Sequence, residues 1–85
     1  MNKFYVNGHA NRVTFTKVKD NIYKPSEHVS RVIGDVNDPE AIDFSGGPFL
    51  MKGNRLRIIT NNTATFVVVT RFIAEGNDYL IQIKL

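Results

Sequence analysis

The sequence predicts an α+β domain: a small antiparallel β-sheet or partly open barrel of about five to six short strands, with one or two short helices between residues 26 and 44. Three observations support this class. The chain has short segments rich in β-branched and aromatic residues, frequent turn signals, and two helix-start patterns near its middle. With 85 residues, it is expected to form a single domain over residues 1–85.

Asparagine and glycine divide the chain into β segments. Asn7-Gly8, Gly53-Asn54, Asn61-Asn62 and Gly76-Asn77 each supply residues that tolerate a positive φ angle. The connections that follow from these turns are short, which suits antiparallel neighbours. We therefore expect strands over residues 4–6, 13–18, 48–51, 55–60, 65–73 and 79–85.

Two segments in the middle of the chain carry helix-start patterns. Ser26 is a suitable N-cap for a helix that runs to about Ile33 and ends at Gly34. Asp38-Pro39 repeats the pattern, with a capping acid before a proline at the first helical position, and predicts one helical turn. Helices this short are unstable alone, so they are expected to pack on the sheet.

The C-terminal segment contains more apolar residues than one sheet face requires. A self-consistent register makes Asn61-Asn62-Thr63 a three-residue loop and leaves a second face of mixed character. The expected cross-strand pairs are Phe72–Ile81, Thr70–Ile83, Ile58–Phe66 and Leu56–Val68. The expected members of the second face are Arg55, Arg57, Val67, Val69, Arg71, Ile73, Leu80, Gln82 and Lys84.

A solvated sheet face is normally polar at nearly every position, so this mixed face is expected to be covered. The protein's own helix or N-terminal strands, a second copy of the chain, or a different molecule are the three alternatives. Arginine suits a partner-binding role because its planar fork pairs with carboxylates while its stem packs on apolar groups. The predicted partner-binding residues are Arg55, Arg57, Val67, Val69, Arg71, Ile73, Leu80 and Lys84.

Charge is unevenly distributed along the chain. Residues 1–34 carry six basic and two acidic groups (+4), residues 35–45 carry four acidic groups (−4), and residues 46–85 carry five basic and two acidic groups (+3). The N-terminal part interleaves cations with aromatic rings, as small β-sheet modules that stack nucleic-acid bases do. The alternative site, for weak and sequence-indifferent binding of RNA or single-stranded DNA, consists of Lys3, Tyr5, Arg12, Lys17 and Lys19.

Composition and motifs argue against enzymatic activity and metal binding. The absence of cysteine excludes a disulfide framework and a thiol nucleophile, and neither His9 nor His28 has a neighbour at metal-ligand spacing. Counted from Asp35, the acidic segment has Glu40 and Gly46 where a calcium loop needs glycine and glutamate. We therefore expect no metal, no cofactor, no catalytic residue and no enzymatic activity.

The chain also lacks a long apolar run and a hydrophobic signal segment, so a cytoplasmic protein that does not bind membranes is expected. The leading functional hypothesis is a non-enzymatic interaction module. It would be a small accessory protein that docks on a protein partner, or on its own copy, through the second face of its C-terminal β-meander. An accessory protein of a virus or mobile element would fit this description.

Overall fold

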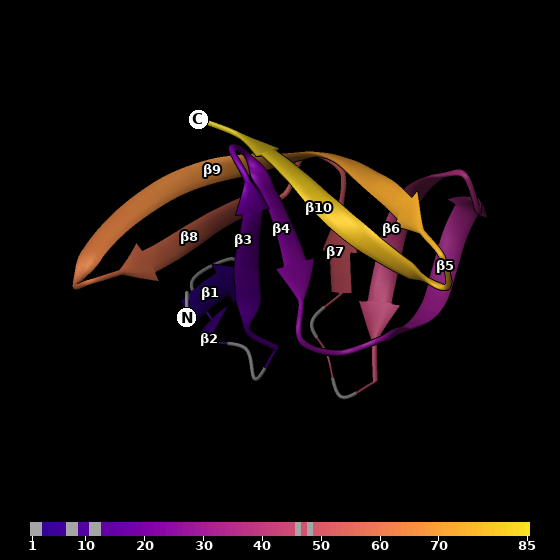
Figure 1. Ribbon diagram of the computed structural model, residues 1–85, viewed down its shortest axis with the longest axis horizontal. Coiled ribbons are helices and arrows are strands. Elements are labelled where there is room, and N and C mark those ends of the chain that lie inside the picture. The colour runs from indigo at the N-terminus through magenta and orange to yellow at the C-terminus, as the bar shows by residue number, and fades with distance from the viewer. Residues whose placement is uncertain (1–2, 7–8, 11–12, 46, 48) are drawn as a thin grey trace.

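The protein is all-β, and the predicted α+β class is wrong. The computed structural model describes residues 3–6, 9–10, 13–45, 47 and 49–85, and of residues 3–6, 9–10 and 60 only the backbone. No helix occurs in these residues, which form more strands than predicted. The strands are β1 (Lys3–Val6), β2 (His9–Ala10), β3 (Phe15–Lys19), β4 (Ile22–Pro25), β5 (Val29–Asp35), β6 (Asp38–Phe44), β7 (Phe49–Met51), β8 (Arg55–Thr60), β9 (Thr63–Glu75) and β10 (Asp78–Lys84) (Figure 1).

The strands form two antiparallel sheets. One continuous stretch of chain, from β7 to β8, connects them. The larger sheet has the order β2-β1-β8-β9-β10-β4-β3, and the smaller one has the order β5-β6-β7. At the end of β7, the Lys52 amide donates to the Glu40 carbonyl (3.0 Å) and prolongs the β6–β7 pairing. The next amide, of Gly53, donates to the Val69 carbonyl (2.8 Å) and prolongs the β8–β9 pairing. The chain thus passes directly from one sheet into the other (Figure 1).

The first predicted helix is a bend followed by β5. Ser26 does not cap a helix: its amide donates to the Thr14 carbonyl (2.8 Å), and its hydroxyl accepts from the Thr14 amide (3.0 Å). These bonds prolong the β3–β4 pairing. Val29, Val32 and Ile33 are β-branched and favour a strand, whereas a helix of this length is unstable by itself. Pairing of β5 with β6 therefore determines the structure of this segment.

The second predicted helical turn is part of β6. The capping pattern belongs to a hairpin turn, in which the Asp35 carboxylate accepts the amide of Asn37 (2.8 Å), because aspartate also initiates tight turns. Gly34, at φ +94°, precedes this turn and lies beside a bulge at Glu40. A Cβ atom at Gly34 would lie 3.2 Å from the Glu40 backbone nitrogen, so glycine at this position permits the close approach.

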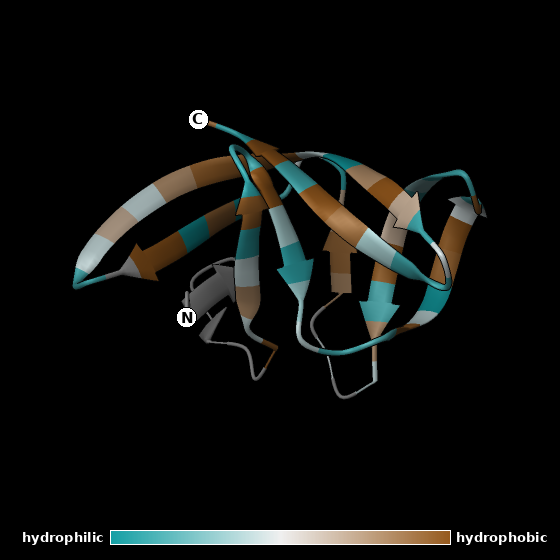
Figure 2. Cartoon of the chain, viewed as in Figure 1, coloured by the Kyte–Doolittle hydropathy of each residue, from teal (hydrophilic) through white to brown (hydrophobic). Residues whose placement is uncertain are grey.

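The core lies between the two sheets and is contributed by both. Phe15 of β3 and Phe44 of β6 meet edge to face, with ring centroids 6.4 Å apart, and join the sheets at the centre. Hydrophobic residues run along the middle of β9 and β10, whereas the turn between β8 and β9 is hydrophilic (Figure 2). The buried cluster comprises Val13, Phe15, Ile42, Phe44, Leu50, Leu56, Ile58, Val67, Val69, Phe72, Tyr79, Ile81 and Ile83.

Candidate functional site

The turn between β8 and β9 sets the register of the candidate surface. Thr60 pairs with Thr63, so only Asn61 and Asn62 form the turn, and both have positive φ angles (51° and 65°). Two consecutive left-handed residues are typical of the type I′ turn that favours two-residue hairpins. The predicted three-residue loop is therefore wrong by one residue, and the strand pairing shifts accordingly.

This shift exchanges the faces of neighbouring residues on β9. Val67 pairs with Leu56 and is 2% exposed, and Val69 is 1% exposed, so both belong to the core. Their predicted position on the second face is wrong. Phe66 takes their place outside: it lies directly opposite Arg57 and is 70% exposed. A one-residue slip reverses every side chain of a strand, which explains the exchange.

A β-bulge on β9 explains why the apolar residues of the C-terminal segment have two parities. Gln82 pairs with Arg71 and Ile83 with Val69, so Thr70 is an extra residue on β9. The Thr70 hydroxyl donates to the Gln82 carbonyl (3.1 Å) at this point. Because the bulge reverses the alternation, the buried residues before and after it point into the same core. The predicted Thr70–Ile83 pair is wrong, and the Phe72–Ile81 pair is confirmed.

We use the term outer face for the side of β8, β9 and β10 that points away from the core. It includes six of the eight predicted partner-binding residues: Arg55, Arg57, Arg71, Ile73, Leu80 and Lys84. Residues that the sequence prediction missed are Ile59, Ala64, Phe66 and Val68. A two-residue turn at Asn61-Asn62 was the signal that could have placed Phe66 outside.

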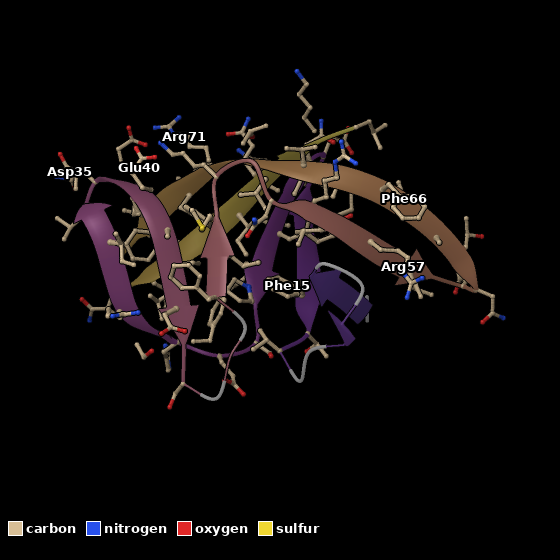
Figure 3. The ribbon with its side chains drawn as sticks, turned by 180° about the vertical axis from the view of Figure 1, so that it is seen from behind. Phe15, Asp35, Glu40, Arg57, Phe66 and Arg71 are labelled. Atoms are coloured by element: carbon tan, nitrogen blue, oxygen red, sulfur yellow. The ribbon has the colours of Figure 1, made fainter. Side chains whose placement is uncertain are left out.

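Exposure differs between the two ends of the outer face. Leu80 is only 8% exposed and its cross-strand partner Ile73 is half-buried, so this end offers little apolar surface. The β8–β9 hairpin projects from the rest of the molecule and presents Phe66 beside Arg57 (Figures 1 and 3). A hollow of about 220 Å³ lies here, which we call the hairpin hollow; it is lined by Arg55, Phe66, Val67 and Val68.

The protein's own helix does not cover this face, because the described residues contain none. The N-terminal strand β1 lies beside β8 in the same sheet, with Tyr5 paired to Arg57, so it widens the sheet instead of covering it. Arg55 is exposed and forms no ion pair with any residue of the described chain. The described residues thus bury the Leu80 end of the outer face but leave Phe66 exposed at its β8–β9 end.

The predicted nucleic-acid residues are divided between two strands: the backbones of Lys3 and Tyr5 lie on β1 beside β8, with Tyr5 opposite Arg57, whereas Lys17 and Lys19 lie on β3. Lys17 and Lys19 are exposed on β3, and Lys17 lies 3.4 Å from Asp20. Strands β4, β10 and β9 separate β3 from β8. The side chains of Lys3, Tyr5 and Arg12 lie outside the described residues.

The acidic segment forms the β5–β6 hairpin at the opposite end of the molecule, where Asp35, Glu40 and Arg71 are visible together (Figure 3). Lys52 bridges Asp38 (2.9 Å) and Glu40 (3.7 Å). The hydrogen bond from Lys52, with its charge, lowers the pKa of Asp38 below its ordinary value. In the part of the chain that the structure describes, no three histidine, cysteine or carboxylate side chains are grouped as a metal site.

Comparisons with protein-family models, with characterised proteins and with solved structures find no match to this chain. Among the described residues, no helix has the length and apolar character needed to cross a membrane. The candidate site therefore depends on the geometry of the hairpin itself.

Proposed function

We propose that this protein is a non-enzymatic interaction module that binds a protein partner through the β8–β9 end of its outer face. The observation that carries the proposal is the 70% exposure of Phe66, which stands directly opposite Arg57 on a projecting hairpin. Covering this ring with a partner would remove its apolar area from water, which favours binding by about 25 cal/mol per Å². Aromatic and arginine side chains are also the residues that dominate binding energy at protein interfaces.

The chemistry of the hairpin hollow indicates what kind of partner surface fits. Phe66 and Val68 supply an apolar wall, and Arg55 supplies a positive charge at the same hollow. At about 220 Å³, the hollow is smaller than the cavities of about 300–1,000 Å³ that enclose small-molecule ligands. It suits one apolar side chain with neighbouring carboxylates, because guanidinium groups pair with carboxylates in a planar, bidentate geometry.

The proposal can be tested with a short fluorescent peptide in which one valine is flanked by aspartates, and with a control peptide that has lysines in their place. The aspartate peptide is expected to bind. Phe66→Ser and Arg55→Gln should each raise its dissociation constant by about tenfold or more, the usual effect of removing a dominant interface residue. The matched control is Val18→Ser, since Val18 is 51% exposed on β3, which β10 and β4 separate from β9 in the sheet. Equal binding by all variants, or preference for the lysine peptide, would contradict the proposal.

Binding of RNA or single-stranded DNA is the alternative, because an exposed phenylalanine beside arginines can also stack on bases. The separation of Lys17 and Lys19 from the hairpin argues against an extended basic track. An oligothymidine titration at several salt concentrations distinguishes the two functions, since phosphate binding weakens linearly in log salt. Binding of the oligonucleotide but not the acidic peptide, lost in Phe66→Ser, would replace the proposed function with this alternative.

A further inference from the structure

A second feature of the molecule complements the hairpin hollow: the turn between β5 and β6, which we call the acidic tip and define as residues 35–38. Val36 projects from this turn and is 62% exposed. Asp35 and Asp38 pair across the base of the turn, so an acidic residue stands at each end of the turn that carries Val36. The tip therefore has the composition for which the hollow is suited, one apolar side chain between two acids.

The acidic tip is held in a defined conformation. The Tyr79 hydroxyl, from β10, donates to the Val36 carbonyl (2.6 Å), and Tyr79 itself is only 8% exposed. The Asp35 carboxylate accepts the Asn37 amide (2.8 Å) within the turn. A turn that is ordered before binding loses little conformational entropy when it docks. Burial of Val36 by a partner is therefore opposed by only a small entropy loss.

The two ends also differ in charge. Asp35 forms no ion pair with any described residue, and the two carboxylates of Asp38 and Glu40 share the single ammonium of Lys52. Arg71 also lies at this end and acts on Asp38, so the three carboxylates exceed the two cations by one negative charge. At the other end, Arg55 keeps a positive charge beside the hollow. Complementary potentials of this kind favour a specific orientation between two surfaces.

We infer that the partner of the hairpin hollow is the acidic tip of a second copy of this chain, so that copies assemble head to tail. This inference rests on the proposed function and names the partner of the same site. The tip and the hollow lie at opposite ends of a molecule whose longest dimension is 35 Å, so one copy cannot fill its own hollow (Figure 3). Each copy offers one tip and one hollow, and such heterologous contacts produce chains or rings instead of a closed pair.

Sedimentation velocity over a wide concentration range tests the inference. The wild-type chain is expected to form dimers and then longer assemblies as concentration rises, without stopping at the dimer. Val36→Asp replaces the apolar side chain of the tip, and Phe66→Asp replaces the aromatic side chain of the hollow. Both residues are exposed, so each variant should fold. Each should remain a monomer, because one of the two contacting surfaces is lost. Val18→Asp, at an exposed site on β3 that belongs to neither the tip nor the hollow, should assemble like wild type.

Mixing the two monomeric variants is the decisive measurement. Val36→Asp retains an intact hollow and Phe66→Asp retains an intact tip, so the mixture should form a one-to-one heterodimer and nothing larger. A mixture that remains monomeric while wild type assembles overturns the inference, as does normal assembly of Val36→Asp alone. A wild-type chain that is monomeric at every concentration also overturns it. In that case, binding of the aspartate peptide would still support the proposed function, and failure of the peptide as well would remove both.

Discussion

The adjacent residues Phe66 and Val67 provide a direct test of the strand register. Substitution of each by aspartate introduces the same charge at neighbouring positions of β9. Because Phe66 is 70% exposed and Val67 is 2% exposed, the structure predicts opposite outcomes. Phe66→Asp should leave the fold intact, whereas Val67→Asp should strongly destabilise or unfold it.

The expected magnitudes follow from burial. Val67→Asp loses about 1.5–3 kcal/mol from the buried valine side chain. It also places an unpaired carboxylate in the core, which costs several kcal/mol more after relaxation. A domain of this length has a free energy of unfolding of about 4–13 kcal/mol, at roughly 0.05–0.15 kcal/mol per residue. Phe66→Asp changes only a solvent-facing strand position, worth about 1 kcal/mol or less.

Urea unfolding followed by far-ultraviolet circular dichroism measures both effects, and it suits a chain that has no tryptophan. The Phe66→Asp transition should lie near that of wild type, while Val67→Asp should show no cooperative transition or one at much lower urea. The reverse outcome, with Val67→Asp stable and Phe66→Asp unfolded, would restore the three-residue loop and refute the register described above. Two equally stable variants would refute the burial of Val67.

Three further predictions concern the β5–β6 hairpin and its contacts. Gly34→Ala should lower the free energy of unfolding by about 1 kcal/mol or more in a urea titration, because φ is +94° and the new Cβ would approach a backbone nitrogen. Tyr79→Phe should lower it by about 0.5–1.5 kcal/mol and speed hydrogen exchange in the turn, because the bond to the Val36 carbonyl is lost. The pKa of Asp38 is lowered in the folded state, so its stabilising effect should be present above the ordinary value of 3.8 and disappear as pH falls below it. In Lys52→Met, this loss of stability due to Asp38 should be absent when the free energy of unfolding is measured from neutral to acidic pH. A pH profile identical to that of wild type would contradict the stabilising role of the Lys52–Asp38 pair.

Local patterns in the sequence were sufficient for the C-terminal meander. β8 was predicted at its observed bounds, 55–60, and antiparallel strands connected by asparagine and glycine turns follow it. The expectation of a second sheet face that combines cations with apolar residues is also met, and six of its predicted binding residues lie there. Side-chain alternation with period two depends only on backbone geometry, so it can be recognised without tertiary information.

The segment from 26 to 44 shows where local patterns fail. Ser26 and Asp38-Pro39 carry residues that serve equally well as helix caps and as turn formers, because both roles use the same side-chain bonds to backbone amides. Only the pairing of β5 with β6, and of β6 with β7, distinguishes the two structures. Contacts between segments decide whether this region is helix or strand, because a short helix has little stability of its own.

The sequence by itself determined that the strand residues of this protein point in two directions and that arginines gather on the side away from the core. Tertiary structure decided which apolar residues join them, through the two-residue turn at Asn61-Asn62 and the bulge at Thr70. The physical reason is that two- and three-residue turns are locally almost equivalent, whereas a one-residue shift exchanges the buried valines of β9 for Phe66. Burial of those valines in a core shared by both sheets selects one register, and that register leaves Phe66 exposed beside the arginines.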